Sequence, residues 1–534
     1  MNSKAVFYAI GRLLQLLSGV LVIPLGLALW DERVKYGADL FARSESVSFL
    51  VTIALTLVVG VALQIYCRSA GKAGSTAKEG FAVVTLGWVF LALAGAVPFI
   101  AWFLQDRPMS ILAVVTAFTD AYFEIMSGFT TTGATILTDI EALPRSLLLW
   151  RSMTHWLGGM GIITLALAIF PAMGVGGYQM FRGEVPGPTA DRLRPRLAET
   201  TKILWGVYLL LSAAETLLLK LGGMNLFDAV CHTFGTLATG GFSTRNASIG
   251  AYDSAYIDWI ITLFMLLAGM NFLIHYRIIF RRDFSLVRSN RELHLYLATF
   301  VVATLIVSLI LTFTGLPDAD VTHAHFQADP RSLLEHREHV AEQIEKVDTF
   351  GGALRHGAFQ VAAILTTTGY GTADFDVWPR AIALGLVVLM FWGGCAGSTG
   401  GGMKIIRIMV VAKAAWRELR KVVRPRLVVP LKVGGVTMKE EMVANILGFF
   451  LLFTGLFVLC SILMAIFIPD LTTAVTSVAA TIGNIGPGLS GVGSTQHYAW
   501  IPLPGKWILI LCMLLGRLEI FTVLVVLRPS FWRR

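Results

Sequence analysis

Four short segments rich in Thr and Gly recur along the sequence, and their residue types suit the binding of a dehydrated cation. They are residues 130–135 (TTTGAT), 238–243 (ATGGFS), 366–371 (TTTGYG) and 483–488 (GNIGPG). Gly permits positive φ, so successive backbone carbonyls can point the same way. A ring of carbonyl oxygens can replace the hydration shell of an ion, and residues 367–371 nearly repeat the T-V-G-Y-G segment that does so in K⁺ channels.

These four segments, called the pore loops here, are regularly spaced and similarly flanked. Aligned on Gly133, Gly241, Gly369 and Gly486, they lie 108, 128 and 117 residues apart. Each follows a half-length apolar stretch, in residues 113–128, 227–237, 353–365 and 471–482. A helix of about 12 residues rises only about 18 Å and does not cross a bilayer. Non-helical backbone at that depth is tolerated only where protein or water surrounds it, which predicts an aqueous pore.

The chemistry of this predicted pore favours cations. Each half-length helix would point the negative end of its dipole at the loop that follows it, which repels anions. Small residues also allow helices to pack closely in membranes, so one such segment would indicate little, but four copies favour a selectivity filter. Its expected residues are Thr131, Thr132, Gly133, Thr239, Gly240, Gly241, Thr367, Thr368, Gly369, Asn484, Ile485 and Gly486.

The composition is that of a multi-pass membrane protein. Of 534 residues, 55% are hydrophobic and only 14% charged, and the mean hydropathy is +0.70. The net charge of +9 comes from basic clusters that alternate with mixed or acidic loops. This pattern predicts cytoplasmic N- and C-termini and argues against nucleic-acid binding. The five cysteines suit neither a disulfide framework nor a zinc site, and we expect them to be packing residues.

The predicted fold is an all-α integral membrane protein with four repeats of helix, pore half-helix, filter loop and helix. Two extra transmembrane helices are expected before the first repeat, which gives about ten full spans and four re-entrant loops. The expected units are residues 1–70 for the extra pair, then repeats at 78–182, 195–288, 292–420 and 440–534. The third repeat would contain a long outer loop.

The motifs together resemble one family. They are residues 128–135 (GFTTTGAT), 156–161 (WLGGMG), 238–244 (ATGGFST), 481–488 (TIGNIGPG) and 515–519 (LGRLE). In these the chain resembles, over nearly its whole length, a TrkH-type subunit of the Trk/Ktr/HKT superfamily of K⁺ transporters. The resemblance implies four channel-like units in a pseudo-fourfold arrangement, a homodimer with one pore per protomer, and a cytosolic nucleotide-binding regulatory subunit. It also implies the bacterial inner membrane.

The resemblance also assigns the ion sites. Members with Ser at the first filter glycine tend towards Na⁺, so Gly133 favours K⁺ here. The fourth loop, with Asn484 and Pro487, departs most from a channel filter, which predicts looser discrimination. No organic cofactor is expected, and transported K⁺ would be bound at Thr132, Gly133, Thr239, Gly240, Thr367, Thr368, Asn484 and Ile485.

A Gly-rich segment, residues 393–402 (GGCAGSTGGG), interrupts the last helix of the third repeat. A break of this kind in a membrane span indicates a functional site, and the resembled family has a gating loop there. A phosphate-binding P-loop is excluded because no G-K-[ST] follows. A flexible packing kink is the alternative. The expected gate residues are Gly393, Gly394, Gly397, Gly400, Gly401, Gly402 and Arg517.

Several charged residues near these elements need partners or a cavity. Arg517 lies at membrane depth, and the family analogy places it in the pore below the filter; the alternative is a structural ion pair. Lys404 and Arg407 are interpreted mainly as cytoplasmic anchors, with a role in the gate or in a partner contact as the alternative. Glu124 and His155 are interpreted as supports of the filter. The carboxylates after the loops would concentrate cations or simply be solvated: Asp139, Glu141, Asp374 and Asp376.

The sequence therefore predicts K⁺ uptake through a gated filter. Symport coupled to H⁺ or Na⁺, or a poorly selective K⁺/Na⁺ pathway, stays open as an alternative. A membrane enzyme is disfavoured because no His, Glu, Asp or Cys groups converge at membrane depth. Metal binding by the outer loop of the third repeat is a weak hypothesis that rests on His323, His325, His336 and His339.

Overall fold

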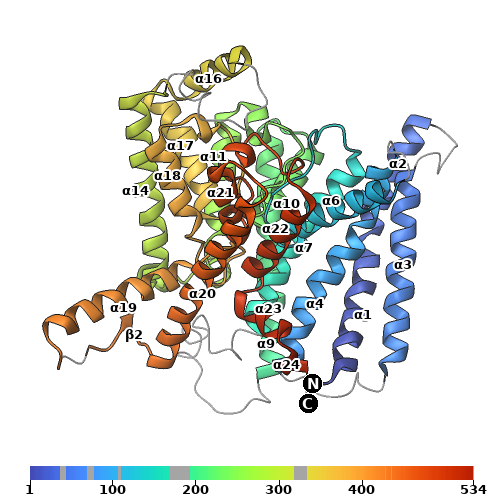
Figure 1. The fold of residues 1–534 in the computed structure, drawn as a ribbon, viewed down its shortest axis with the longest axis horizontal. Helices are drawn as coiled ribbons and strands as arrows, with labels where there is room; N and C mark the ends of the chain where they lie inside the picture. Colours follow the sequence, from blue (N-terminus) through green and yellow to red (C-terminus); the bar gives the residue numbers. More distant parts are fainter. Residues whose placement is uncertain are drawn as a thin grey trace.

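The computed structural model describes residues 1–36, 44–68, 77–105, 110–168, 193–317, 333–426, 429–434 and 436–532. These residues form a bundle of helices (Figure 1). In the described part of the chain the only strands are β1 (Lys432–Val433) and β2 (Val436–Thr437), an antiparallel pair in which Lys432 faces Thr437. His323 and His325 lie outside the described residues.

The chain begins with helices that carry no pore loop. They are α1 (Ser3–Val20), α2 (Val22–Tyr36) and α3 (Ser44–Tyr66). Residues 3–34 have the length and hydropathy of one span and residues 45–66 those of a second, as expected for two extra helices. In Figure 1 they stand at one side of the bundle, next to α4.

The four repeats share one order of elements: an outer helix, a pore helix, a loop and an inner helix. The first repeat has α4 (Ala77–Gly95), α5 (Val97–Leu104), α6 (Ile111–Phe129) and α7 (Arg145–Ala168). The second has α9 (Leu193–Leu221), α10 (Leu226–Leu237), α11 (Ala255–Ala268) and α12 (Phe272–Arg281), and α13 (Ser285–Ser289) follows it.

The third and fourth repeats keep this order with additions. The third has α14 (Arg291–Thr314), α16 (Leu333–Val347), α17 (Phe350–Leu365), α18 (Arg380–Met390) and α19 (Ile405–Val423). The fourth has α20 (Glu440–Ala465), α21 (Leu471–Ile482), α22 (Leu503–Arg517), α23 (Ile520–Leu527) and α24 (Pro529–Trp532).

Seven helical segments of the described residues have the length and hydropathy of a membrane span, or nine if each bent helix pair counts as one. The two bent pairs are α11 with α12, at 102°, and α22 with α23, at 118°. One of the seven is the pore helix α6, whose 19 residues exceed the half-length expected. In the apolar 18-residue stretch of α6, 61% is buried inside the protein, against 28–39% for the corresponding stretches of the other six segments. The helix α6 therefore lies inside the protein rather than against lipid.

All four pore helices begin at a side-chain cap, which satisfies backbone N–H groups that would otherwise lack a partner. The capping residues are Ser110, Asn225, Thr349 and Asp470. Apart from their first turns the pore helices are buried, and they meet in the middle of the bundle. Both termini and α19 lie at one end of the molecule, here called the terminal end, and α16 lies at the other (Figure 1).

Candidate functional site

Each pore loop begins as the C-terminal cap of its pore helix. In all four repeats the residue just before the loop glycine donates its N–H to the pore helix by the same bond. The donors are Thr132, Gly240, Thr368 and Ile485, and the acceptors, each at 2.8 Å, are the carbonyls of Ser127, Gly235, Ala363 and Ala480. This is the six-to-one bond of a Schellman motif, which requires a left-handed residue just before the donor. The pore loop therefore starts from a defined backbone geometry in every repeat.

Three of the four left-handed residues are Thr, for which this conformation is unusual, and the fourth is Asn, which adopts it more readily. They are Thr131, Thr239, Thr367 and Asn484, with φ between 50° and 61°. A β-branched residue rarely adopts this conformation, and backbone strain of this kind clusters at functional sites. Two residues later each loop has its glycine at positive φ, with 83° at Gly133, 80° at Gly241, 78° at Gly369 and 102° at Gly486. Left-handed residues thus alternate with ordinary ones in all four loops.

The four loops close into a ring. Each glycine abuts the carbonyl oxygen of the residue that precedes the glycine of the next loop, so closely that a Cβ on the glycine would collide with it. The pairs are Gly133 with Gly240, Gly241 with Thr368, Gly369 with Ile485, and Gly486 with Thr132. The order runs from the first repeat through the fourth and back to the first. One layer of carbonyl oxygens therefore has pseudo-fourfold symmetry.

The ring has polar side chains on its pore-helix side. The hydroxyl groups of Thr130 and Thr132 lie 2.8 Å apart, as do those of Thr366 and Thr368. In the fourth loop the Asn484 amide takes another role and donates to Thr132 Oγ1 at 3.0 Å and to a carbonyl of α22. Among the described residues, two buried oxygens here have no hydrogen-bond partner, Thr131 Oγ1 and Asn484 Oδ1. Buried oxygens without a partner are unusual and suit a cation ligand.

On the other side of the ring, towards α16, lies a cavity of about 120 Å³. All four loop glycines and the segments that follow them line it, including His497 and Tyr498 of the fourth repeat. Tyr498 donates its hydroxyl hydrogen to the Gly486 carbonyl at 2.7 Å. The ring therefore connects directly to a vestibule.

A buried ion pair holds the first loop to the second. Glu124 of α6 accepts from Arg151 Nε at 2.6 Å, and both side chains are at most 2% exposed. Glu124 also accepts from the backbone of Ile136, just after the first loop, and Arg151 donates to the carbonyl of Ser243, just after the second. Glu124 is thus a hydrogen-bonded support, as expected from the sequence. His155 supports the second loop by stacking on Phe242, with ring centroids 4.0 Å apart.

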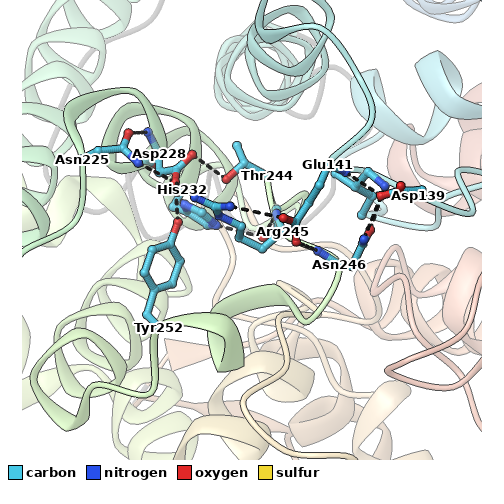
Figure 2. Close-up of polar contacts among 11 residues, drawn as sticks. Asp139, Glu141, Asn225, Asp228, His232, Thr244, Arg245, Asn246 and Tyr252 are labelled. Carbon is cyan, nitrogen blue, oxygen red and sulfur yellow. Dashed lines mark hydrogen bonds and ion pairs between the residues drawn. The ribbon is translucent and has the colours of Figure 1, made fainter.

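The second repeat has a wider polar network behind its loop (Figure 2). Asp228 of α10 accepts from Asn225, Thr244, Tyr252 and Arg245. Arg245 also donates to Glu141, and Asn246 donates to Asp139, so the network extends to the first repeat. The hydrogen bond from Asn246 holds the pKa of Asp139 below its usual value, so this carboxylate stays ionised in the network.

The corresponding carboxylates of the third repeat are not solvated loop charges. Asp374 is 2% exposed. Its carboxylate contacts His339 of α16 at 2.9 Å and accepts from Ser494 of the fourth repeat at 3.0 Å. Asp376 accepts from the backbone of Ser490. These residues fasten the third repeat to the fourth and to α16. Among the described residues no group of three or more potential metal ligands is present.

The Gly-rich segment lies directly below the ring, on its terminal side. The N–H of Gly401 donates to Thr367 Oγ1 at 2.7 Å, and a Cβ on Gly401 would lie 2.6 Å from the Gly483 carbonyl. Thr399 donates to the Leu237 carbonyl at the end of α10. The segment thus touches the ends of the pore helices of the second, third and fourth repeats.

Arg517 completes this layer from the end of α22. Its two terminal nitrogens donate to the carbonyls of Thr399, at 2.6 Å, and Gly158, at 3.1 Å. It is 2% exposed, and in the described part of the chain no carboxylate lies within ion-pair distance of it. The alternative of a structural ion pair is therefore wrong, because Glu519 pairs with Arg407 instead.

The interpretation of Lys404 and Arg407 as cytoplasmic anchors is also wrong. Lys404 Nζ donates to the Gly400 carbonyl within the Gly-rich segment. Arg407 is 5% exposed and lies over the ring of Phe449, 4.1 Å from its centroid. In the sequence, a basic residue directly after a membrane segment looks the same whether it is a cytoplasmic anchor or a buried structural residue. For Arg407 only the tertiary contact with Glu519 shows that it is the latter.

Sequence reasoning missed two further polar supports of the loops, His232 and Gln360, although one signal was present. Glu124, His232 and Gln360 each lie nine residues before the glycine of their loop (133−124, 241−232, 369−360). Each bonds to the segment after its own loop: Glu124 at Ile136, His232 at Ser243 and Gln360 at Ala373. Aligning the repeats on the glycines would have identified this position.

Comparison with known proteins gives matches over the whole chain. A family model named TrkH and described as a cation transport protein matches residues 45–534. The Trk system potassium uptake proteins TrkH of Salmonella typhimurium and Halomonas elongata are 36% and 38% identical, over 100% of both chains in each case. A crystal structure of the potassium transporter TrkH from Vibrio parahaemolyticus has 34% identity and a TM-score of 0.79, with 100% of both chains covered.

Proposed function

Because this chain belongs to the TrkH family of cation transport proteins, we propose that it takes up K⁺ through the ring of carbonyl oxygens that its pore loops form. The chain is a multi-pass membrane transporter and not an enzyme. Relatives matched over their full length are named for potassium uptake. The observation that carries the proposal is the closed order of the ring, in which every loop presents a carbonyl to its neighbour.

The K⁺ sites are assigned to backbone oxygens of the residues at and before the ring. These are Thr132, Gly133, Thr239, Gly240, Thr367, Thr368, Asn484 and Ile485. Alternating left-handed residues turn consecutive carbonyls towards one axis, where they replace the water around the ion. On the side of the ring that faces the terminal end of the molecule, Thr131 Oγ1 and Asn484 Oδ1 add side-chain oxygens that have no other hydrogen-bond partner among the described residues. The fourth loop has Asn484 where the other three loops have Thr, so the ring is not fully symmetric. The preference for K⁺ over Na⁺ is therefore weaker than in a symmetric filter.

The gate of this pore is the Gly-rich segment together with Arg517. Gly393 packs against Gly401 and Gly402 within the segment, and Gly394 and Gly397 pack against Gly269 and Asn271 of the second repeat. Gly400, Gly401 and Gly402 lie against the ends of the third and fourth pore helices. A cation that leaves the ring towards the terminal end meets this segment and the buried guanidinium of Arg517. Its positive charge opposes cation passage until the segment moves.

The assembly follows the family. The chain forms a homodimer with one pore per protomer, in the bacterial inner membrane, and a cytosolic nucleotide-binding subunit controls the gate. Both termini lie at the same end of the molecule as α19. Basic residues gather at that end, among them Arg417, Arg420 and Lys421, and by the positive-inside rule they support a cytoplasmic location for it.

The test of transport is the reversal potential of purified protein in a planar bilayer with K⁺, Na⁺, Rb⁺ or Cs⁺. The proposal predicts a K⁺-dependent potential with measurable Na⁺ leakage. A flux assay with ion substitution separates a channel from a symporter, since coupled uptake stops when H⁺ or Na⁺ gradients are removed. A pathway that conducts all four ions equally would contradict the filter.

The gate has its own test. Shortening the Gly-rich segment, or replacing Arg517 with Ala, is expected to raise K⁺ flux when no regulatory subunit is present. Unchanged flux in both variants, with intact purified protein, would refute the gate and leave the filter untouched.

A further inference from the structure

One carboxylate outside the pore binds both the Gly-rich segment and the start of the helix that follows it. Glu292 lies in the first turn of α14, where Asn290 caps the helix by accepting from the backbone of Glu292 and Leu293. Its Oε1 atom accepts from the N–H of Ala396 at 2.7 Å and from the N–H of Ile406 at 3.3 Å. Ala396 belongs to the Gly-rich segment, and Ile406 belongs to the first turn of α19.

The two bonds bracket the part of the segment that lies under the ring. Thr399, which accepts from Arg517, and Gly401, which donates to Thr367, both lie between Ala396 and Ile406. Fixing these two points therefore fixes the chain between them. The Gly-rich backbone has few side chains to hold it in place, so its position depends on contacts from outside.

Glu292 also supplies what the start of α19 lacks. The residue before this helix, Lys404, makes no side-chain cap bond, so N–H groups of the first turn need another acceptor. A carboxylate at a helix N-terminus is favoured by the helix dipole as well. Glu292 is 4% exposed and packs beside a cluster that includes Leu293, Cys395 and Ile405. The two backbone N–H groups give this buried carboxyl group hydrogen-bond partners.

We propose that Glu292 is the positioning residue that keeps the gate closed, by fastening the Gly-rich segment and the first turn of α19 to the start of α14. This inference rests on the proposed gate. The helix α14 is an outer helix that does not line the ring. In this inference α14 stays in place, and the Gly-rich segment and α19 move relative to it when the gate opens.

The test compares Glu292→Ala with Glu292→Gln, which retains an acceptor oxygen, and with Glu441→Ala as a matched control. Glu441 is also an acidic residue in the first turn of a membrane helix, α20, but it is exposed. The measurements are K⁺ flux into proteoliposomes without a regulatory subunit and the rate at which a thiol reagent labels Cys395. Cys395 lies in the Gly-rich segment and is 1% exposed. The other four cysteines, Cys67, Cys231, Cys460 and Cys512, are replaced by Ala for the labelling.

Loss of two hydrogen bonds, each worth about 1 kcal/mol, should raise both flux and labelling of Glu292→Ala about tenfold or more. Glu292→Gln should change them much less, and Glu441→Ala not at all. If the alanine variant is not monodisperse, Glu292→Asp decides, because it keeps the charge but is one methylene too short to reach both N–H groups. Labelling and flux equal to those of Glu441→Ala would overturn the inference. If the shortened segment raises flux while the Glu292 variants do not, the gate stands and only the role of Glu292 fails.

Discussion

The ring predicts a graded response to substitution of its four glycines by alanine. A real Cβ atom essentially never comes within 3.0 Å of another heavy atom. At Gly486 the new Cβ would lie 2.7 Å from the Thr132 carbonyl, so a shift of about 0.3 Å (3.0−2.7) relieves the clash. At Gly133, Gly241 and Gly369 the distance is below 2.5 Å, and the opposing carbonyl must move by more than 0.5 Å (3.0−2.5).

Each substitution also carries the cost of positive φ, about 1–3 kcal/mol. At about 1.4 kcal/mol for a factor of ten, this alone lowers the population of intact rings by about fivefold to a hundredfold or more. We therefore expect Gly369→Ala, Gly241→Ala and Gly133→Ala to lose nearly all selective K⁺ flux, and Gly486→Ala to be the mildest. Gly133→Ser should likewise raise Na⁺ permeability relative to K⁺.

The assay is flux of K⁺ and Na⁺ into proteoliposomes that contain equal amounts of monodisperse variant. The matched control is Gly455→Ala in α20, where nothing lies within 4 Å of the new Cβ and flux should match the unmodified protein. If K⁺ and Na⁺ flux through Gly369→Ala equalled the flux through Gly455→Ala, the assignment of the ring as the ion pathway would be refuted. A Gly486→Ala variant more severely impaired than the other three would refute it as well.

Three further predictions concern the supports of the ring. Glu124→Gln leaves Arg151 buried without its charge partner, so we expect the free energy of unfolding to fall by about 3–5 kcal/mol. The loss is measured as a lower thermal midpoint, and a double variant that also carries Arg151→Met should recover part of the lost stability. Tyr498→Phe removes the bond to the Gly486 carbonyl, worth about 1 kcal/mol, and should reduce K⁺ over Na⁺ discrimination several-fold by reversal potential while uptake persists. Arg245→Gln should change uptake little, because its side chain is 39% exposed and exposed ion pairs contribute about 0–1 kcal/mol; a large loss would contradict this.

Local patterns were sufficient to predict the repeats and the four loops. A backbone position with positive φ strongly favours Gly, so each loop keeps a glycine at the same place. The four loops could therefore be aligned from the sequence on Gly133, Gly241, Gly369 and Gly486. The left-handed conformation of Thr131 and its three counterparts was not predictable in the same way, because Thr disfavours it. Nor was the length of α6, since a 19-residue apolar helix reads as a membrane span until its burial is known.

Contacts between distant segments account for what sequence reasoning missed. Arg407 and Glu519 are 112 residues apart, and Glu292 and Ala396 are 104 apart. Nothing local indicates that the start of α14, the Gly-rich segment and the break after Arg517 meet. Glu292, Arg407 and Glu519, each taken alone, resemble ordinary charges near the end of a membrane helix. Their roles become visible only from contacts within the third repeat, for Glu292, and between the third and fourth repeats, for Arg407 and Glu519.

The covalent linkage of the four quarters has a consequence for how ion preference can evolve. In a channel made of four identical chains, one codon change alters all four corners of the filter together. Here the quarters mutate separately, and the fourth already holds Asn484 where the other three hold Thr131, Thr239 and Thr367. Discrimination between ions can thus drift in small steps, one corner at a time, without passing through an intermediate whose entire conduction path has been rebuilt.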